Sequence, residues 1–301
     1  MNVLVVGGTG FIGSKLCGEL VERGHDVTAL SRDPSETALP DAVETYAGDV
    51  TDYDGIEGAF EGRDAVVYLV ALSPLFDPKG GGNVHDRVHL GGTRNALAAA
   101  EAHGVERFVH MSALGADPDG PTAYLRAKGK AEQAVMESDR DWVVFRPSVV
   151  FGEDGEFVAF TKEMKSSFAP GLPFYPLPGG GKTPFQPIWV GDLVPMLADA
   201  VEDDAHVGEA YDVGGPAVVT LADVARMAFR AAGKSVNIVP LPMPLAKLGL
   251  TLMGPLPFVP FGPDQARSLE LDNRVDHNDV DAFGVDPTKL RTVADYLGLE
   301  E

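Results

Sequence analysis

The run GGTGFIG at residues 7–13 constrains the fold of this chain more than any other feature. It follows residues 2–6, an apolar stretch without polar alternation, which is typical of a central parallel strand covered on both faces. A helix is expected from residue 11 or 12 to about residue 23, ending at Gly24. Closely spaced glycines let the backbone turn tightly and approach a pyrophosphate, whose charge is met by the N–H groups of the helix N-terminus. We therefore expect a dinucleotide site with Thr9 as the helix cap; the alternative is a glycine-rich turn without a ligand.

Strand and helix patterns alternate through the rest of the first half. Further strands are expected at residues 25–30, up to about 48, 65–72, 107–111 and 142–145, and helices at 92–103 and about 121–138. After a stretch rich in proline and glycine, the pattern returns with a strand at 188–190, a helix to about 201, a strand at 211–213 and a helix from Thr220 to about 232. This alternation predicts the α/β class, with a doubly wound parallel Rossmann sheet.

The change of texture after residue 150 predicts two domains. We expect a dinucleotide-binding domain at residues 1–150, with a return segment at about 186–214. Residues 151–185 and 215–301 should form a smaller substrate-binding or lid domain. The proline- and glycine-rich residues 168–187 are interpreted as loops over a site rather than as a linker.

The charge of the chain excludes one class of partner. It carries 45 Asp and Glu against 24 Lys and Arg, a formal net charge of −21 over 301 residues, whereas a nucleic-acid surface needs clustered cations. Scattered acidity favours adaptation to a cytoplasm of high salt, where the Debye screening length shortens to about 3 Å at 1 M; an ordinary acidic enzyme is the alternative.

The single cysteine, Cys17, suits a reducing cytoplasm. No run reaches the roughly 18 apolar residues of a membrane span, and the histidines show no metal pattern, so we expect no metal site.

The end of the second strand bears on the choice of cofactor. Ser31 stands where a ribose-binding acid is expected, and Arg32 follows. A hydroxyl and a guanidinium suit a 2′-phosphate, which favours NADP(H), whereas binding of the ribose by Asp33 would favour NAD(H). Asp49, at the end of the third strand, can accept a hydrogen bond from the adenine amino group. The expected cofactor-binding residues are Gly7, Thr9, Gly10, Phe11, Ile12, Gly13, Ser31, Arg32, Asp49, Val50, Val70, Ala71, Lys128, Pro147 and Val150.

Tyr124 and Lys128 are the candidate catalytic pair. They lie one helical turn apart on the same face of a predicted helix. A phenol with a pKa near 10 is a poor acid or base at neutral pH, and a nearby ammonium favours its phenolate. Ser112, at the end of the preceding strand, can hydrogen-bond a substrate oxygen or serve structure alone. Tyr-x-x-x-Lys occurs by chance on many helices, so its value here comes from its place after a strand of the predicted sheet.

These residues together resemble a known superfamily over nearly the whole chain. GGTGFIG, Asp49, Ser112, the Tyr124–Lys128 pair and the run RPSVVFG from Arg146 are similar to the extended and atypical short-chain dehydrogenases/reductases. RPSVVFGEDGEF, PFQPIWVGDL, YDVGGPAVVTL and PDQARSLELDN resemble the branch typified by the nucleotide-binding accessory subunit of respiratory complex I. The resemblance implies a Rossmann domain, a small C-terminal substrate domain and bound NADP(H).

The function expected from this resemblance is an NADP(H)-dependent oxidoreductase or epimerase. Tyr124 would exchange a proton with a substrate oxygen, Lys128 would lower the tyrosine pKa and hold the nicotinamide ribose, and Ser112 would orient the oxygen. The alternative is a catalytically silent NADPH-binding accessory or regulatory protein, because the bound cofactor can be structural in the complex-I-like branch. His89 stands where the sugar-nucleotide epimerases tend to carry Asn, and this difference disfavours a sugar-nucleotide substrate.

The substrate side is expected to be apolar. One interpretation is a hydrophobic pocket or a membrane-facing patch for a lipid-like carbonyl compound, with peripheral contact at the inner membrane face; the other is a small-domain core. Prolines in residues 241–263 prevent a long amphipathic helix. The residues concerned are Phe168, Leu172, Phe174, Tyr175, Leu248, Leu250, Leu252, Met253, Leu256, Phe258, Val259 and Phe261.

Overall fold

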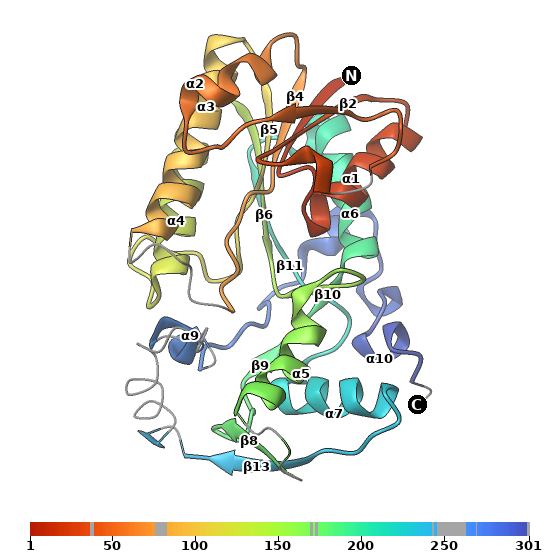
Figure 1. Ribbon diagram of the computed structural model, residues 1–301. Helices are drawn as coiled ribbons and strands as arrows, with labels where there is room; N and C mark the ends of the chain where they lie inside the picture. Colours follow the sequence, from red (N-terminus) through yellow and green to blue (C-terminus); the bar gives the residue numbers. More distant parts are fainter. Residues whose placement is uncertain are drawn as a thin grey trace.

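The chain folds around one seven-stranded parallel sheet, as the computed structural model shows (Figure 1). The structure describes residues 1–36, 39–75, 83–168, 171, 174–242, 244–245, 263–268 and 270–299. The spatial order of the strands is β11-β6-β5-β4-β1-β2-β3, and every neighbouring pair is parallel. The strands are β1 (Asn2–Val6), β2 (Asp26–Ser31), β3 (Glu44–Ala47), β4 (Ala65–Tyr68), β5 (Arg107–Met111), β6 (Asp141–Pro147) and β11 (Glu209–Val213).

Helices cover both faces of this sheet, which confirms the predicted doubly wound fold. On β1, Val3 and Val5 belong to a core shared with α1 (Phe11–Glu22) and α6 (Val190–Glu202). Leu4 and Val6 point to the other face, because successive strand residues alternate. The helices on that face are α2 (Tyr53–Ile56), η2 (Glu57–Phe60), α3 (Gly92–Ala102) and α4 (Ala123–Met136).

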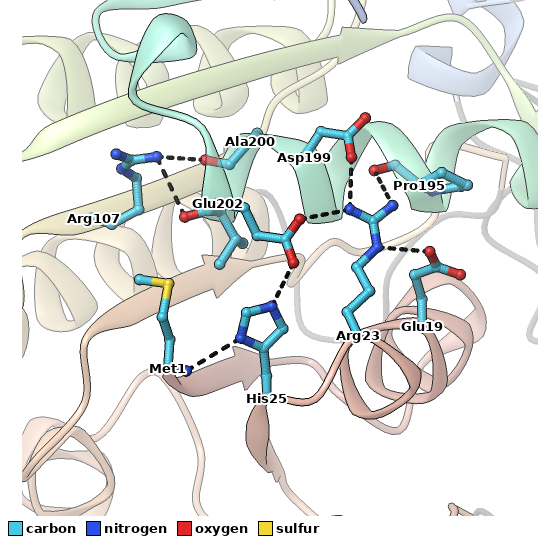
Figure 2. Close-up of polar contacts among 10 residues, drawn as sticks. Met1, Glu19, Arg23, His25, Arg107, Pro195, Asp199, Ala200 and Glu202 are labelled. Carbon is cyan, nitrogen blue, oxygen red and sulfur yellow. Dashed lines mark hydrogen bonds and ion pairs between the residues drawn. The ribbon is translucent and has the colours of Figure 1, made fainter.

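Arg23 joins the two helices of the first face at the amino-terminal edge of the sheet (Figure 2). Its Nη1 donates to Asp199 at 2.6 Å and to Glu202 at 2.8 Å on α6. Its Nε donates to Glu19 on α1 at 2.8 Å. His25 extends the cluster, with its Nε2 2.7 Å from a Glu202 oxygen. The cluster lies opposite the carboxyl ends of the strands, so its contribution is to stability.

A second group of elements packs below the sheet in Figure 1 around its own core. Here β7 pairs with β10 and β8 with β13 in parallel, while β9 and β12 are antiparallel. This core buries Phe151, Tyr175 and Phe185. The elements are β7 (Val150–Phe151), α5 (Glu156–Phe168), β8 (Phe174–Pro178), β9 (Pro184–Phe185), β12 (Val219–Thr220), α7 (Leu221–Ala231), β13 (Asn237–Leu241), α9 (Pro263–Ser268) and α10 (Val293–Tyr296). The short strand β10 (Ile188–Trp189) lies between the two groups, with Ile188 in the core of the central sheet.

Short helical turns complete the described chain. One of them, η3 (Asp86–Gly91), is a π-helix that leads directly into α3. The 3₁₀ turns besides η2 are η1 (Pro34–Glu36), η4 (Asp204–His206), η5 (Asp279–Phe283) and η6 (Pro287–Lys289). Within the described ranges, no helix is both long and apolar enough to cross a membrane.

Several expected boundaries need correction. The strand predicted at residues 65–72 ends at Tyr68, because the four apolar residues that follow leave the sheet to line a cavity. Residues 168–187 are not only loops, since β8 and β9 form there. Gly10, not Thr9, is the N-cap of α1. Most of the apolar stretch 241–263 lies outside the described residues.

Candidate functional site

The glycine loop is packed too tightly for any other residue at two of its positions. A Cβ on Gly13 would lie 2.2 Å from the Gly7 carbonyl oxygen, and a Cβ on Gly8 would lie 2.5 Å from the Ala29 Cβ. Gly7 adopts a φ of +89°, which L side chains rarely adopt. α1 begins at Phe11 without a side-chain cap, so its first N–H groups are available to an anion.

A cavity of about 580 Å³ opens beside this loop at the carboxyl ends of β1, β2, β3 and β4. This is the edge at which parallel α/β sheets bind ligands. Nine of the expected cofactor-binding residues line it: Gly7, Thr9, Gly10, Ser31, Arg32, Asp49, Val50, Val70 and Ala71. Sequence reasoning missed Gly48, Thr51, Leu69, Leu72, Arg87 and Val88 in this wall. The cavity is a well-formed candidate for a dinucleotide.

The other expected cofactor residues lie elsewhere. Phe11, Ile12 and Gly13 form the first turn of α1 behind the loop and are not part of the described cavity wall. Pro147 lines a second, apolar pocket, and Val150 starts β7 next to it. Lys128 is on α4.

Polar groups gather at the β2 and β3 end of the cavity. The Ser31 hydroxyl is buried, and no hydrogen-bond partner for it is present among the described residues. Asp49 accepts hydrogen bonds from Thr51 N at 2.9 Å and from its Oγ1 at 2.8 Å. The backbone bond from Thr51 lowers the pKa of Asp49 most, and the positive charges of Arg32 and Arg87 lower it further. Two cations and an unsatisfied hydroxyl therefore share this end.

Asp33, the alternative ribose-binding residue, lines the same cavity but is already engaged. Its Oδ1 accepts from the Ser35 hydroxyl at 2.6 Å and from Ser35 N at 3.1 Å. These two bonds lower the pKa of the Asp33 carboxyl, so it stays ionised. To bind a ribose, the Asp33 carboxylate would have to accept from the ribose hydroxyls in addition to Ser35.

Tyr124 and Lys128 lie on the first turns of α4, which begins with Thr122 as its N-cap. Lys128 is 1% exposed and donates from Nζ to the Met111 carbonyl at 2.8 Å. Burial lowers the pKa of Lys128 to about 8, against the opposing charge of Glu132. Burial also raises the pKa of Tyr124, and the expected lowering of that pKa by Lys128 is not seen in this structure. The phenol is therefore protonated at neutral pH.

Ser112 belongs to a partly buried ionic network. Its hydroxyl donates to Glu132 Oε2 at 2.5 Å. The other oxygen of Glu132 accepts from Arg146 Nε at 2.9 Å, and Arg146 reaches Asp212 at 3.4 Å. Ser112 is not among the described residues that line the apolar pocket. These contacts engage the hydroxyl within the fold, and the catalytic role expected for Ser112 stays a prediction.

Three buried histidines surround the Tyr124 region, a cluster that the sequence pattern did not reveal. His89, on η3, accepts a hydrogen bond at Nε2 from the Leu72 N–H at 2.9 Å. The Tyr124 ring packs edge-on against the rings of His89, at 5.3 Å, and His85, at 5.9 Å. His110 on β5 is 1% exposed. Across the described chain, no His, Cys, Asp or Glu side chains form a metal-binding cluster.

A second pocket of about 280 Å³ lies beside Tyr124, between the central sheet and the lower elements. Its walls are mainly apolar, and among the described lining residues none is Lys or Arg. Pro74 and Leu75 lie in its wall, only a few residues after Leu72 in the cofactor cavity. The residues that sequence reasoning missed here include Phe157, Phe160, Phe185, Leu221 and Asn273.

The expected apolar lid residues divide between core and surface. Tyr175 is fully buried in the lower core and donates its hydroxyl to the Thr161 carbonyl at 2.9 Å, so it belongs to the small-domain core. Phe174 is 37% exposed. The side chain of Phe168 and the whole of Leu172, Leu248, Leu250, Leu252, Met253, Leu256, Phe258, Val259 and Phe261 lie outside the described residues.

The parallel sheet, the glycine loop and the cavity define a dinucleotide-binding Rossmann protein. A family model described as NAD(P)H-binding matches residues 7–168, more than half of the chain. The chain belongs to this NAD(P)H-binding family, among oxidoreductases and epimerases of the epimerase/dehydratase superfamily.

Several curated relatives are similar over most of the chain. An NAD(P)H azoreductase of Xenophilus azovorans is 32% identical over 255 residues, covering 84% of this chain and 81% of the relative. Subunit 9 of the mitochondrial NADH dehydrogenase (ubiquinone) 1 alpha subcomplex of Arabidopsis thaliana is 28% identical over 306 residues, covering 95% and 74%. A 3 beta-hydroxysteroid dehydrogenase/isomerase of Mycobacterium tuberculosis is 30% identical over 264 residues, covering 77% and 70%.

Solved structures show the same fold. The crystal structure of gox2253 superposes with a TM-score of 0.73 at 24% identity, covering 98% of this chain and 95% of that one. The Thermus thermophilus UDP-glucose 4-epimerase in complex with NAD has a TM-score of 0.64 at 25% identity, covering 94% and 99%. The likeness therefore extends beyond the nucleotide-binding half to the lower elements.

Proposed function

We propose that this protein is an NADP(H)-dependent oxidoreductase that reduces the carbonyl group of an uncharged, largely apolar substrate. The observation that carries the proposal is the adjacency of two cavities. Residues 69–72 line the dinucleotide cavity, and Pro74 and Leu75 line the apolar pocket, where Tyr124 also lies. A substrate in the apolar pocket would therefore meet both a proton donor and the inner end of the cofactor cavity.

The residues present fit NADP(H). The glycine cradle admits no Cβ at Gly13, and the buried Ser31 hydroxyl has a donor to offer. Arg32 and Arg87 supply positive charge at the same end of the cavity, as a 2′-phosphate requires. We propose that Ser31 and Arg32 hold this phosphate and that Lys128 holds the nicotinamide ribose. NAD(H), with Asp33 on the ribose, is the competing assignment.

In the proposed reaction the protein supplies the proton that the substrate oxygen takes up. Reduced nicotinamide, when bound, supplies a hydride to a carbonyl carbon. Tyr124 donates its phenolic proton to the carbonyl oxygen as charge develops there, a role that suits a phenol kept protonated by burial. The Lys128 ammonium, one helical turn further, is proposed to stabilise the phenolate that forms in the reaction, a role that does not show in the pKa of Tyr124 in this structure. Ser112 supports this arrangement through Glu132 rather than by touching the substrate.

The apolar pocket argues against a sugar-nucleotide substrate. A diphosphate needs cations or aligned N–H donors, and the described lining holds neither Lys nor Arg. Its carboxylate, Asp272, is bound by Arg274 Nε at 2.9 and 3.0 Å.

We also propose the division of the chain into two domains. Residues 1–150 and 186–214 form the dinucleotide-binding domain, and residues 151–185 and 215–301 form the smaller domain, so that the pocket lies between the two.

A catalytically silent NADPH-binding accessory protein is the second candidate. Two observations favour it: the similarity to the subunit of the NADH dehydrogenase alpha subcomplex, and the Lys128 ammonium bound to a backbone carbonyl. Such a protein would bind NADPH without consuming it.

Turnover assays separate these candidates. Purified protein is incubated with NADPH and a quinone, an aromatic aldehyde, a 3-ketosteroid or an azo dye, with a charged α-keto acid as the control. We expect NADPH oxidation with at least one apolar substrate, and a loss of at least a hundredfold in kcat for Tyr124→Phe with NADPH affinity retained. NADPH binding without oxidation by any substrate would favour the accessory protein.

A further inference from the structure

We propose that His89 is a positioning residue of this site, which fixes the segment between the two cavities and braces the Tyr124 ring. The inference rests on the proposed function for its catalytic meaning. Two contacts of His89 carry the inference. The Leu72 N–H donates to its Nε2 at 2.9 Å, and its ring packs edge-on against the Tyr124 ring with 5.3 Å between the ring centroids.

The segment held by His89 has little other support from the sheet. Leu69 N donates to the Val6 carbonyl at 2.9 Å, as the last bond of the β1–β4 ladder. Beyond it the chain leaves the sheet and forms the wall of the cofactor cavity through Leu72. Two residues later, Pro74 is in the wall of the apolar pocket. The bond to His89 therefore fixes the chain where the nicotinamide end of the cofactor must meet the substrate.

His89 is built to act as a permanent acceptor. Its side chain is 1% exposed, and burial together with the charge of Lys128 and the neighbouring His85 and His110 lowers its pKa to about 2. The imidazole is therefore neutral at any working pH. Because Nε2 accepts from Leu72, the ring proton is on Nδ1. A protonated imidazole would lose this acceptor and release the segment.

The local backbone also marks the position. η3 is a π-helix, a rare arrangement found mostly as single turns and often at functional sites. His89 lies within this π-helix and His85 is its N-cap residue, and the Tyr124 ring contacts the two imidazoles of His85 and His89 at interplanar angles of 81° and 86°. One short element thus links the strand end, the catalytic phenol and the cofactor wall.

The test compares variants that keep or lose the acceptor. His89→Gln offers an amide oxygen at similar reach, whereas His89→Phe keeps a flat ring and offers none. The probes are NADPH and 2′,5′-ADP, which lacks the nicotinamide half, with affinities measured by fluorescence or calorimetry on the full chain. We expect His89→Phe to bind NADPH about tenfold more weakly, which equals about 1.4 kcal/mol, and 2′,5′-ADP unchanged. Gln should restore NADPH affinity to within about threefold.

Hydrogen exchange at the Leu72 amide gives a direct readout. We expect protection in the wild type and in His89→Gln, and fast exchange in His89→Phe. His103→Phe is the control, because His103 lies at the far end of α3 and pairs with Glu57 at 2.5 Å. If His89→Phe does not fold, His89→Leu, which also lacks an acceptor, takes its place.

Three results would overturn the proposal: unchanged NADPH affinity in His89→Phe, equal losses for NADPH and 2′,5′-ADP, or no rescue by Gln. The second result indicates a merely structural role, since a destabilised fold weakens both ligands. If the wild-type protein binds NADPH but does not oxidise it in the presence of any substrate tested, the proposed function is refuted. The binding measurements then still decide whether His89 has the proposed positioning role. A wild type that binds no NADPH overturns both.

Discussion

Replacing Lys128 by Met should make this protein more stable at neutral pH. The ammonium is 1% exposed, and burial lowers its pKa from 10.5 to about 8. A change of one in pKa corresponds to about 1.4 kcal/mol, so the buried charge costs the fold about 3 kcal/mol at pH 7. Methionine removes this cost and keeps the length of the side chain. It also leaves the Met111 carbonyl without the bond at 2.8 Å, a loss of about 1–2 kcal/mol. We expect a net gain of about 1–2 kcal/mol.

The gain should reverse with pH. Below about pH 8, Lys128 is charged in both the folded and the unfolded chain, and the fold carries the whole cost. Between about pH 8 and 10.5 the folded protein has released this proton while the unfolded chain still binds it, so the wild type gains stability relative to the variant. Near pH 10 about 0.8 kcal/mol of the cost remains, and the lost hydrogen bond of about 1–2 kcal/mol should make Lys128→Met the less stable protein by up to about 1 kcal/mol.

Urea unfolding of both proteins between pH 7 and pH 10 measures this difference. The pKa values of His89 and His110 depend on the charge of Lys128, but burial keeps both imidazoles neutral across this range, so the difference isolates Lys128. Lys130→Met is the matched control: its side chain is 41% exposed and lies 3.6 Å from Asp86, so we expect a difference below about 0.5 kcal/mol at every pH. A Lys128→Met variant that is less stable at pH 7, or a difference that stays constant across this pH range, would refute the reasoning.

Three further predictions test the cofactor site and the fold. Gly13→Ala would place a Cβ 2.2 Å from the Gly7 carbonyl and should weaken NADPH binding more than tenfold in a fluorescence titration; Gly18→Ala, whose Cβ meets no atom within 4 Å, should bind normally. Arg32→Gln should weaken NADPH about tenfold and NADH less than twofold, and equal losses would contradict a 2′-phosphate contact. Arg23→Met should lower the free energy of unfolding by about 1–2 kcal/mol without changing NADPH affinity, because its cluster lies at the opposite sheet edge.

The sequence predicted those parts of the fold and site that depend on neighbouring residues. β1 and β5 have the expected bounds. The apolar run VLVV of β1 is typical of a central strand that is buried on both faces. The glycine loop was also recognised, because its signal depends only on the spacing of neighbouring residues between a strand and a helix. The run at residues 65–72 misled, because an apolar cavity wall has the same composition as a buried strand.

The remaining features depend on contacts between distant segments. The bond of Ser112 to Glu132 spans 20 positions and could not be read from either residue alone. The apolar pocket joins Tyr124 to Asn273, and the cofactor cavity gains Arg87 from a π-helix that no simple periodicity predicts. The adaptation to high salt and the cytoplasmic location stay predictions from charge and from a single buried cysteine.

The energetic cost of Lys128 also bears on the choice between an enzyme and a silent accessory protein. A cofactor held only for structure needs the glycine loop and the cations at the β2 end of the cavity. It uses Lys128 at most as a ligand of the nicotinamide ribose and has no need of the neighbouring Tyr124 phenol. A buried charge that costs the fold about 3 kcal/mol is expected where a function depends on that charge. The same site holds a phenol kept protonated by burial and a neutral His89 bound to the cavity wall. Of these, the protonated phenol in the wall of the apolar pocket is the group that proton donation to a bound carbonyl needs, and it is the physical reason for proposing turnover as well as binding.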